Sequence, residues 1–395
     1  MLASIKSHIQ RILSPTWTDT LVDTTPDHKN KRISIARVGN QLFWGMLTNK
    51  KNLRDVETQS ELAGHRISDT TMTGVLERFS AGKLPALIAK QVKQASADKE
   101  LRSSSLPYSM VAIDGKNLFT LRAVVDECGT TTPPTKRRLM ALRATLVSSD
   151  VAQVLGQRMI PNKSAETTEL IPFLKEQDAL YGKTDFYEVV SVDAGMTHLK
   201  NADFMHEKGI LYLMGLKGNQ PALFKIAQKV TRNLKAVACS TDIHGGYEIV
   251  RQLSVADIRG NFKKWSHATE IWKVNQTKTH KVSKKLIEET RYYITSMPKG
   301  KASSRQKLHT VRRHWGTEND AFWTLDAIFD EDSSPFTSKA IEIVSLVRIM
   351  AFNIMARFRG RRLKSARNRA LRWNDFVQYF QAAFILYFIK PIHTG

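Results

Sequence analysis

Short apolar runs between residues 106 and 221 constrain the fold of this chain more than any other feature. Runs of about 4–8 apolar residues bounded by turn residues are typical of strands buried in a sheet. A helix-compatible stretch, TELIPFLKEQDALYG, lies among them, and strands mixed with helices are typical of an α/β layer. The sequence therefore predicts an α/β fold whose sheet contains MVAIDG, LMALRATLVS, VAQVLGQRMI, YEVVSVDAG and ILYLMGLKG.

Different textures flank this layer. Residues 1–105 are basic and carry apolar positions at helical spacing, which predicts a helical N-terminal domain that binds DNA. A helical domain that serves only for packing fits the same pattern equally well. We expect the first part of the core at 106–221, a β-rich insertion at 222–300, a helical second part of the core at 301–360, and a basic, aromatic tail at 361–395.

The charge of the chain indicates a polyanionic partner. Its 395 residues include 60 Lys and Arg against 37 Asp and Glu, a formal net charge of +23. Basic side chains that bind phosphates release counterions, so this excess favours nucleic acid; a generally basic protein, or one that binds anionic lipid, is the alternative. We expect no contact with a membrane interior, because no uninterrupted apolar run reaches the roughly 20 residues that cross a bilayer.

Cysteine use and the N-terminus predict a cytoplasmic protein. Cys128 and Cys239 stand far apart without neighbouring metal-ligand residues, which is typical of a reducing compartment and argues against a zinc site. The first residues, MLASIKSHIQRIL, lack the layout of a signal peptide.

Two aspartates end apolar runs of the α/β layer. Asp114 follows MVAI and precedes Gly115, and Asp193 follows VVSV and precedes Ala194 and Gly195. An acid at a strand end places its carboxylate at the edge of a sheet, where it can hold a metal ion. An acid there also starts turns by accepting hydrogen bonds from the backbone, so either role fits each aspartate alone.

A third acid, Glu318, lies within RRHWGTENDAFW, where the helical period assigns it to an apolar face. A carboxylate on a buried face is costly unless it is paired, so Glu318 either pairs with Arg312 or Arg313 or holds a cation in a cleft. Mg²⁺ prefers oxygen ligands, and two such ions about 4 Å apart can activate water and stabilise the leaving oxygen of a phosphodiester. A site for divalent ions would explain all three acids together. The apolar positions on this face are Val311, Trp315, Phe322, Leu325 and Phe329.

Charged and aromatic positions continue beyond Glu318. Trp323 lies one position off its face, so the indole either packs between helices or stacks on an exposed base. The run DED at residues 330–332 is expected to be exposed at a helix end, and Arg348 interrupts the apolar run SLVRIMAFNIMARF. The basic run 357–372 either clamps the DNA backbone or forms a solvated helix.

Six segments resemble, in order, those of certain bacterial insertion-sequence transposases. These are DDE transposases, in particular the H-repeat-associated group, and the resemblance spans roughly residues 20–375. The family has an RNase H-like catalytic core whose third acid follows a β-rich insertion, which is the layout expected above. The specific segments are LKGNQPALF and HWGTENDAFWTLDAIFDED; the others are IDGK, VDAG, HGGYEIVR and RYYITSM.

This resemblance implies that Asp114, Asp193 and Glu318 form a catalytic triad that binds two Mg²⁺ (or Mn²⁺) ions. It also implies a strand-to-helix turn at residues 217–221, with Asn219 as the N-cap; the turn either contacts DNA or only caps the helix. The residues then expected to bind DNA are Lys116, Lys217, Asn219, Gln220, Arg251, Arg312, Arg313, His314, Asn319, Trp323, Arg361 and Arg362.

The function implied is that of a DDE-type DNA transposase, which cleaves at transposon ends and transfers the strands into target DNA. The expected partners are double-stranded DNA with terminal inverted repeats, target DNA and a second copy of the chain, as a homodimer on DNA in the bacterial nucleoid. A metal-dependent RNase H-like nuclease or resolvase, and a non-catalytic DNA-binding relative, are the alternatives.

Overall fold

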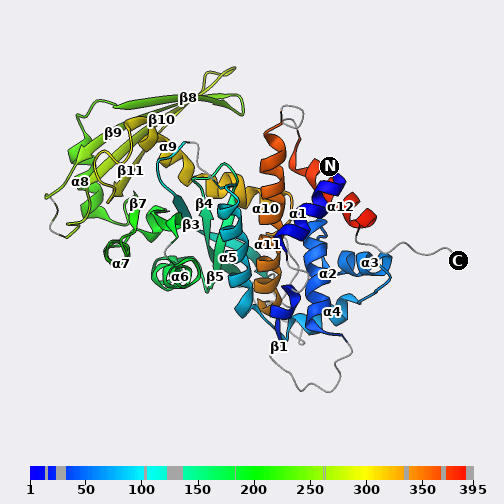
Figure 1. Ribbon diagram of the computed structural model, residues 1–395. Coiled ribbons are helices and arrows are strands. Elements are labelled where there is room, and N and C mark those ends of the chain that lie inside the picture. Colours follow the sequence, from blue (N-terminus) through cyan, green and yellow to red (C-terminus); the bar gives the residue numbers. More distant parts are fainter. Residues whose placement is uncertain are drawn as a thin grey trace, which may run out of the picture.

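A mixed sheet forms the centre of the computed structural model (Figure 1). The structure describes residues 1–13, 17–23, 33–101, 105–121, 137–182, 184–260, 262, 264–332, 338–365 and 371–387, so Cys128 lies outside the described residues. Within them the strand order is β5-β4-β3-β6-β7-β11-β10-β9-β8. The strands are β3 (Met110–Leu121), β4 (Arg137–Leu146), β5 (Gln153–Ile160), β6 (Val189–Val192), β7 (Leu211–Leu216), β8 (Ala238–His244), β9 (Tyr247–Asp257), β10 (Glu270–His280) and β11 (Leu286–Thr295).

Strands β3 to β7 have the topology of an RNase H-like core. β3, β4 and β5 pair antiparallel, whereas β6 and β7 run parallel to β3. Parallel neighbours need crossover connections, which α6 (Glu166–Tyr181) and α7 (Leu199–Glu207) supply. The start of β3, Met110 to Ile113, is fully buried, as expected for an uninterrupted apolar run in a central strand. The predicted α/β, RNase H-like core is confirmed.

The strand-rich segment after β7 continues the core sheet. β8 to β11 pair antiparallel in sequence order, and β11 joins the core edge by pairing with β7. Helix α8 (Pro221–Thr231) connects β7 to β8 and packs against β9 and β10. In Figure 1 these four strands extend away from the helices at the other end of the molecule. The insertion therefore lengthens one sheet by adding four strands to the β7 edge of the core.

Helices from both ends of the chain form a layer beside β5. α11 contacts α2, α5 and β5, and α12 contacts α1 and α2 (Figure 1). Their apolar residues belong to one hydrophobic cluster that also includes the core sheet. None of the helices in the described part of the chain is long and apolar enough to cross a membrane. These helices are α1 (Leu2–Ile12), α2 (Ile35–Leu47), α3 (Leu53–Leu62), α4 (Asp69–Leu76), α5 (Leu84–Ala97), α11 (Ser338–Leu363) and α12 (Trp373–Tyr387).

The helical segment around Glu318 is interrupted by a π-helical turn. α9 (Ser304–His314) begins with a capping box and is followed by η6 (Thr317–Phe322), a π-helix, and by α10 (Trp323–Ala327). Phe322 and Leu325 are buried, but Glu318 is exposed, so the prediction that it lies on a buried face is wrong. A π turn has i→i+5 hydrogen bonds and therefore holds more residues than a turn of α-helix. The residues that follow it are rotated relative to a regular α-helix.

Buried ion pairs fasten α11 and the segment that follows α10 to the sheet. Arg143 on β4 donates to Glu331 at 2.5 and 2.6 Å and to Ser345 of α11 at 2.7 Å. Both members of the Arg143–Glu331 pair are almost fully buried. The prediction of an exposed acidic run is therefore wrong for Glu331, because its charge is neutralised inside the core. Arg348, which interrupts the apolar run of α11, lies 3.8 Å from the Glu331 carboxylate.

Candidate active site

Asp114 and Asp193 occupy equivalent positions on neighbouring parallel strands. Ile113 of β3 and Val192 of β6 are paired in the register of the sheet, and each aspartate follows one of them directly. Strands in a sheet lie about 4.8 Å apart, so the two aspartates leave adjacent strands side by side. Both are half-buried. The structure thus brings these two predicted acids together at the carboxyl end of the parallel pair.

Each aspartate uses one carboxylate oxygen locally. Oδ1 of Asp193 accepts hydrogen bonds from the backbone N–H of Gly195 at 2.8 Å and of Met196 at 3.3 Å, which caps the short helix η5 (Ala194–Met196). Oδ1 of Asp114 accepts from the N–H of Gly115 at 2.7 Å. Asp193 starts a turn, whereas β3 continues past Asp114 to Leu121, so the turn considered at Asp114 does not form. The second oxygen of each carboxylate has no hydrogen bond within the described residues, which leaves it open to a metal ion.

Asp114 lies near other acids, and their negative charges act on its pKa. Burial and the negative charge of Asp193 raise the pKa of Asp114 to about 7, although the Gly115 N–H lowers it. Glu318 and Glu166 raise the pKa further, so Glu318 acts on Asp114 across the site. A protein that gathers carboxylates in this way favours a cation among them.

Glu318 makes no ion pair within the described residues, so the alternative that it pairs with Arg312 or Arg313 is not formed. Arg312 pairs with Asp242 at 2.9 Å, and Arg313 pairs with Asp320 at 3.3 Å and donates to the backbone carbonyls of Val147 and Ser149. No three Asp, Glu, His or Cys side chains in the described part of the chain stand close enough together to hold a metal ion as they are placed. The carboxylates of Asp114, Asp193 and Glu318 nevertheless have the right chemistry for a hard cation, since Mg²⁺ and Mn²⁺ favour carboxylate oxygens.

Two residues expected to bind DNA are instead inside the protein. Lys116 is 6% exposed, and its ammonium group forms an ion pair with Asp326 of α10. His314 is 7% exposed and bonds the hydroxyl of Ser191 at 3.0 Å. Burial lowers the pKa of His314 to about 4, so the imidazole is neutral at pH 7. As placed, both side chains position neighbouring elements and are closed to a phosphate.

The turn after β7 lies against the turn that carries Asp193. The side-chain amide of Asn219 donates to the carbonyl of Ala194 at 2.6 Å, and that of Gln220 donates to Thr197 at 3.1 Å. Pro221 is the first residue of α8, as expected, but the N-cap is Gln220, so the assignment of Asn219 as N-cap is wrong. The hydrogen bond from Asn219 stabilises the turn that carries Asp193. Lys217, two residues earlier, is exposed.

A basic cavity of about 450 Å³ lies between the insertion and Glu318. It brings together Arg251 of β9, Arg312 and Arg313 of α9, and Asn319, all of which were expected to bind DNA. Burial and the positive charge of Arg312 lower the pKa of Arg251, as expected where cations crowd together. Arg291 of β11, which was not among the residues expected to bind DNA, also lines the cavity, and its guanidinium lies 4.3 Å from the Trp315 ring centre. The RYYITSM segment was the one sequence signal for this residue. Further lining residues are Lys278, His309 and Glu318.

A second cavity of about 810 Å³ is lined in part by residues of the Glu318 turn. Arg313 and Asn319 line both cavities, and Trp323, which is 56% exposed, lines the second. The indole therefore does not pack in the core. Arg359 and Trp373 also face this cavity, with the guanidinium of Arg359 5.0 Å from the Trp373 ring centre.

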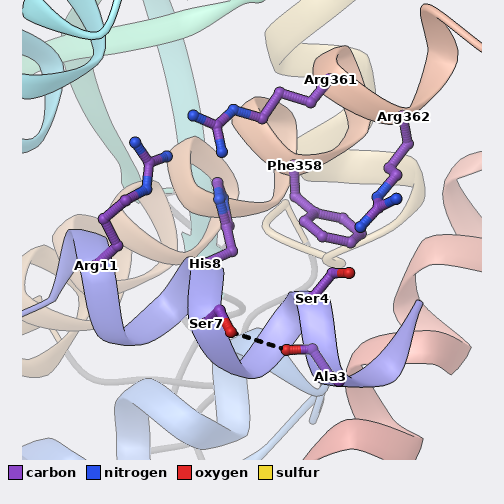
Figure 2. A pocket seen from close by; sticks show the side chains of 8 residues that line it. All are labelled: Ala3, Ser4, Ser7, His8, Arg11, Phe358, Arg361 and Arg362. Atoms are coloured by element: carbon purple, nitrogen blue, oxygen red, sulfur yellow. Dashed lines mark hydrogen bonds between the residues drawn. The ribbon is translucent and has the colours of Figure 1, made fainter.

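Arg361 and Arg362 lie apart from the carboxylates, at a cavity of about 450 Å³ between α1 and α11. Figure 2 shows His8 between Arg11 and Arg361, with Arg362 beside Phe358. Arg361 forms an ion pair with Glu100, and the guanidinium of Arg362 lies 5.0 Å from the Phe358 ring centre. The structure does not bring these two arginines to the Asp114 site.

Neighbouring carboxylates on an RNase H-like sheet, beside a basic cavity, are typical of enzymes that cleave phosphodiesters with metal ions. The family of the Transposase DDE domain matches residues 107–354, more than half of the chain, and the chain therefore belongs to this family of DDE transposases. Such enzymes cleave DNA and transfer its strands with divalent metal ions. No curated protein matches the sequence. Among solved structures, a cryo-EM structure of a piggyBac transposase synaptic complex with hairpin DNA has a TM-score of 0.45 and 9% identity, over 96% of this chain and 79% of that one.

Proposed function

We propose that Asp114, Asp193 and Glu318 hold the divalent ions of this transposase. The observation that carries the proposal is the adjacency of Asp114 and Asp193 on β3 and β6, together with the raised pKa of Asp114. Glu318 joins them by rotation of its side chain, since exposed side chains change rotamer readily. Two ions, Mg²⁺ or Mn²⁺, match the number and type of oxygen ligands that three carboxylates supply.

When bound, the ions would activate the attacking water or 3′-hydroxyl and stabilise the leaving oxygen. The chain's own residues prepare this step. The backbone N–H groups of Gly195 and Met196 hold Asp193 in place, and the N–H of Gly115 holds Asp114. Preorganised carboxylates avoid the cost of reordering ligands during the reaction. No covalent bond between protein and DNA is needed.

We propose that the transposon end lies along the two cavities that flank the Glu318 turn. Arg251, Arg291 and Arg312 would contact phosphates on the side of the insertion. Trp323 would stack on an exposed base on the other side, as its exposure supports. Lys217, on the turn beside Asp193, would contact a third stretch of backbone.

The partners follow from the reaction. Joining two transposon ends to one target requires at least two active sites, so we propose that a homodimer assembles on DNA with terminal inverted repeats and target DNA. The motifs shared with the H-repeat-associated insertion-sequence transposases support a place in that group and action at the bacterial nucleoid. Residues 1–105 and the basic segment that ends α11 would supply further DNA contacts.

A strand-transfer assay tests this proposal. The substrate is DNA carrying the inverted repeats that flank the coding region, incubated with a target plasmid and Mg²⁺ or Mn²⁺. We expect D114N, D193N and E318Q each to lose both cleavage and joining by about 100-fold or more, because the ions contribute several kcal/mol to the transition state. D332N removes an exposed acid and is expected to retain activity.

The products separate the alternatives. Cleavage without joining would assign the chain to the nucleases, and binding without cleavage would make it a non-catalytic relative. Full activity of D114N or E318Q would exclude the triad. Light scattering on the complex with end DNA gives the number of subunits, and a single subunit in an active complex would contradict the dimer.

A further inference from the structure

Glu166 is a further buried acid close to Asp114, outside the proposed triad. It is the first residue of α6, the helix that crosses from β5 to β6, and it is only 4% exposed. Within the described part of the chain its carboxylate has no hydrogen bond and no ion pair. A carboxylate that is largely removed from water and lacks a partner favours a cation beside it.

The geometry places Glu166 against the strand that carries Asp114. A Cβ atom added to Gly115 would lie 1.9 Å from Oε1 of Glu166, so this oxygen occupies the space that a side chain at position 115 would take. The carboxylate of Asp114 bonds the N–H of the same Gly115 at 2.7 Å. Two carboxylates therefore meet at one glycine, and the absence of a side chain there is what permits the approach.

The start of α6 is also fastened to the Asp193 turn. The hydroxyl of Thr167 donates to the carbonyl of Gly195 at 2.8 Å, and the side-chain amide of Asn201 donates to the carbonyl of Thr167 at 3.2 Å. Burial and Asp193 raise the pKa of Glu166, while Lys163 lowers it. Glu166 is thus linked to the Asp193 turn through the neighbouring Thr167 and to the Asp114 strand through Gly115.

We propose that Glu166 supplies a fourth carboxylate to the divalent-metal site of Asp114, Asp193 and Glu318. The inference rests on the proposed function of that triad. Glu166 approaches from α6, on the sheet side opposite to the one where Lys116 meets α10, since Gly115 and Lys116 are successive strand residues. With Glu318 coming from η6, carboxylates from both sides of the sheet would close around the ions.

A role in helix stability is the alternative explanation of Glu166. A carboxylate in the first turn of a helix interacts favourably with the helix dipole, and this interaction requires no metal. Glu169 provides a matched control, because it lies in the same first turn and carries the same charge. Its carboxylate pairs with Arg158 at 2.7 Å, so it needs no cation from solution.

Titration of the full-length protein with Mn²⁺ alone, followed by electron paramagnetic resonance of the free ion, tests the proposal without DNA or activity. We expect E166Q to bind Mn²⁺ about 10-fold or more weakly than the wild type, and E169Q to bind it as the wild type does. Mn²⁺ should also raise the melting temperature of the wild type and of E169Q by more than that of E166Q. E166D, which keeps the charge on a shorter side chain, should lie between, and it serves if E166Q does not fold.

The D114N variant distinguishes the two proposals. If D114N loses Mn²⁺ binding and E166Q binds as the wild type, Glu166 is not a ligand and the triad stands. If D114N and E166Q both bind as the wild type, both proposals are overturned. If E169Q weakens Mn²⁺ binding as much as E166Q does, the effect belongs to the helix and the fourth carboxylate is excluded.

Discussion

The positions of individual site residues on their own strands can be predicted from the sequence. Asp114 and Asp193 each follow an apolar run, and the structure places both at the end of the parallel pairing of β3 and β6. The partner of such a residue cannot be predicted in the same way, as Lys116 shows. The alternation of a strand correctly assigns it to one face, but its partner Asp326 lies on α10, far along the chain. A predicted DNA contact is therefore occupied by an ion pair.

Gly115 gives a prediction at the scale of one residue. G115A places a methyl group where Oε1 of Glu166 lies, so we expect a loss of about 1–3 kcal/mol in the free energy of unfolding, measured by denaturant titration. In an E166A background the same change should cost under about 0.5 kcal/mol, because the clash is gone. An equal cost in both backgrounds would show that Glu166 does not occupy this space.

Among the elements, the π-helical turn η6 has the largest effect on the site. A regular helix would place Glu318 on the same face as Phe322 and Leu325, which was the expectation. Instead the turn exposes Glu318 at the basic cavity, while Phe322 and Leu325 stay buried. Residue spacing identifies a helix but does not show where a π turn adds a residue. The π turn arises from a change in the backbone hydrogen bonds, which the spacing of apolar residues does not record.

The basic cavity formed by β9, β10, β11 and α9 gives a prediction at this scale. R312Q should weaken binding of duplex DNA and reduce the slope of log affinity against log salt by about 1, because one phosphate contact releases about one counterion. Fluorescence anisotropy across a salt series measures both quantities. The fold should persist, since the partner Asp242 and Arg312 are both partly exposed.

Lys281 supplies the control for this experiment. It is an exposed lysine in the connection between β10 and β11 and does not line the cavity. K281Q removes the same charge and should change neither quantity beyond the error of the titration. An equal effect of R312Q and K281Q would mean that DNA responds only to the overall charge of the insertion.

At the scale of the whole molecule, the Arg143–Glu331 pair joins the sheet to the layer that contains α11. Removing one member of a buried pair leaves the other charge without a partner, so E331Q should lower the free energy of unfolding by about 3–5 kcal/mol at pH 7. D332N changes the neighbouring exposed acid and should have almost no effect. Chemical denaturation of the three proteins compares them directly, and equal stability of E331Q and the wild type would contradict a structural role for the pair.

The same pair gives this difference a pH dependence. The nearby charges of Arg143 and Arg348 outweigh burial and lower the pKa of Glu331 from 4.5 to about 2. A carboxyl with a lowered pKa stabilises the folded state above its unfolded pKa, and this contribution is lost as the pH falls. The gap between the wild type and E331Q should therefore be constant above about pH 5 and shrink below it. A stability difference between the wild type and E331Q that grows as the pH falls would contradict a lowered pKa of Glu331.

The sequence by itself determined the class of fold and the order of its elements. Apolar run lengths, strand-ending aspartates and the net charge of +23 are local or summed properties, which no packing arrangement changes. The family of the chain follows from the same residues.

Only the tertiary structure decided which charges meet. The exposure of Glu318, the burial of Glu331 with Arg143 and the approach of Glu166 to Gly115 all join segments that lie far apart in the chain. Spacing along a chain sets which face of its own element a side chain takes. The distance between two elements is set by how their surfaces pack, and electrostatic interactions depend on that distance.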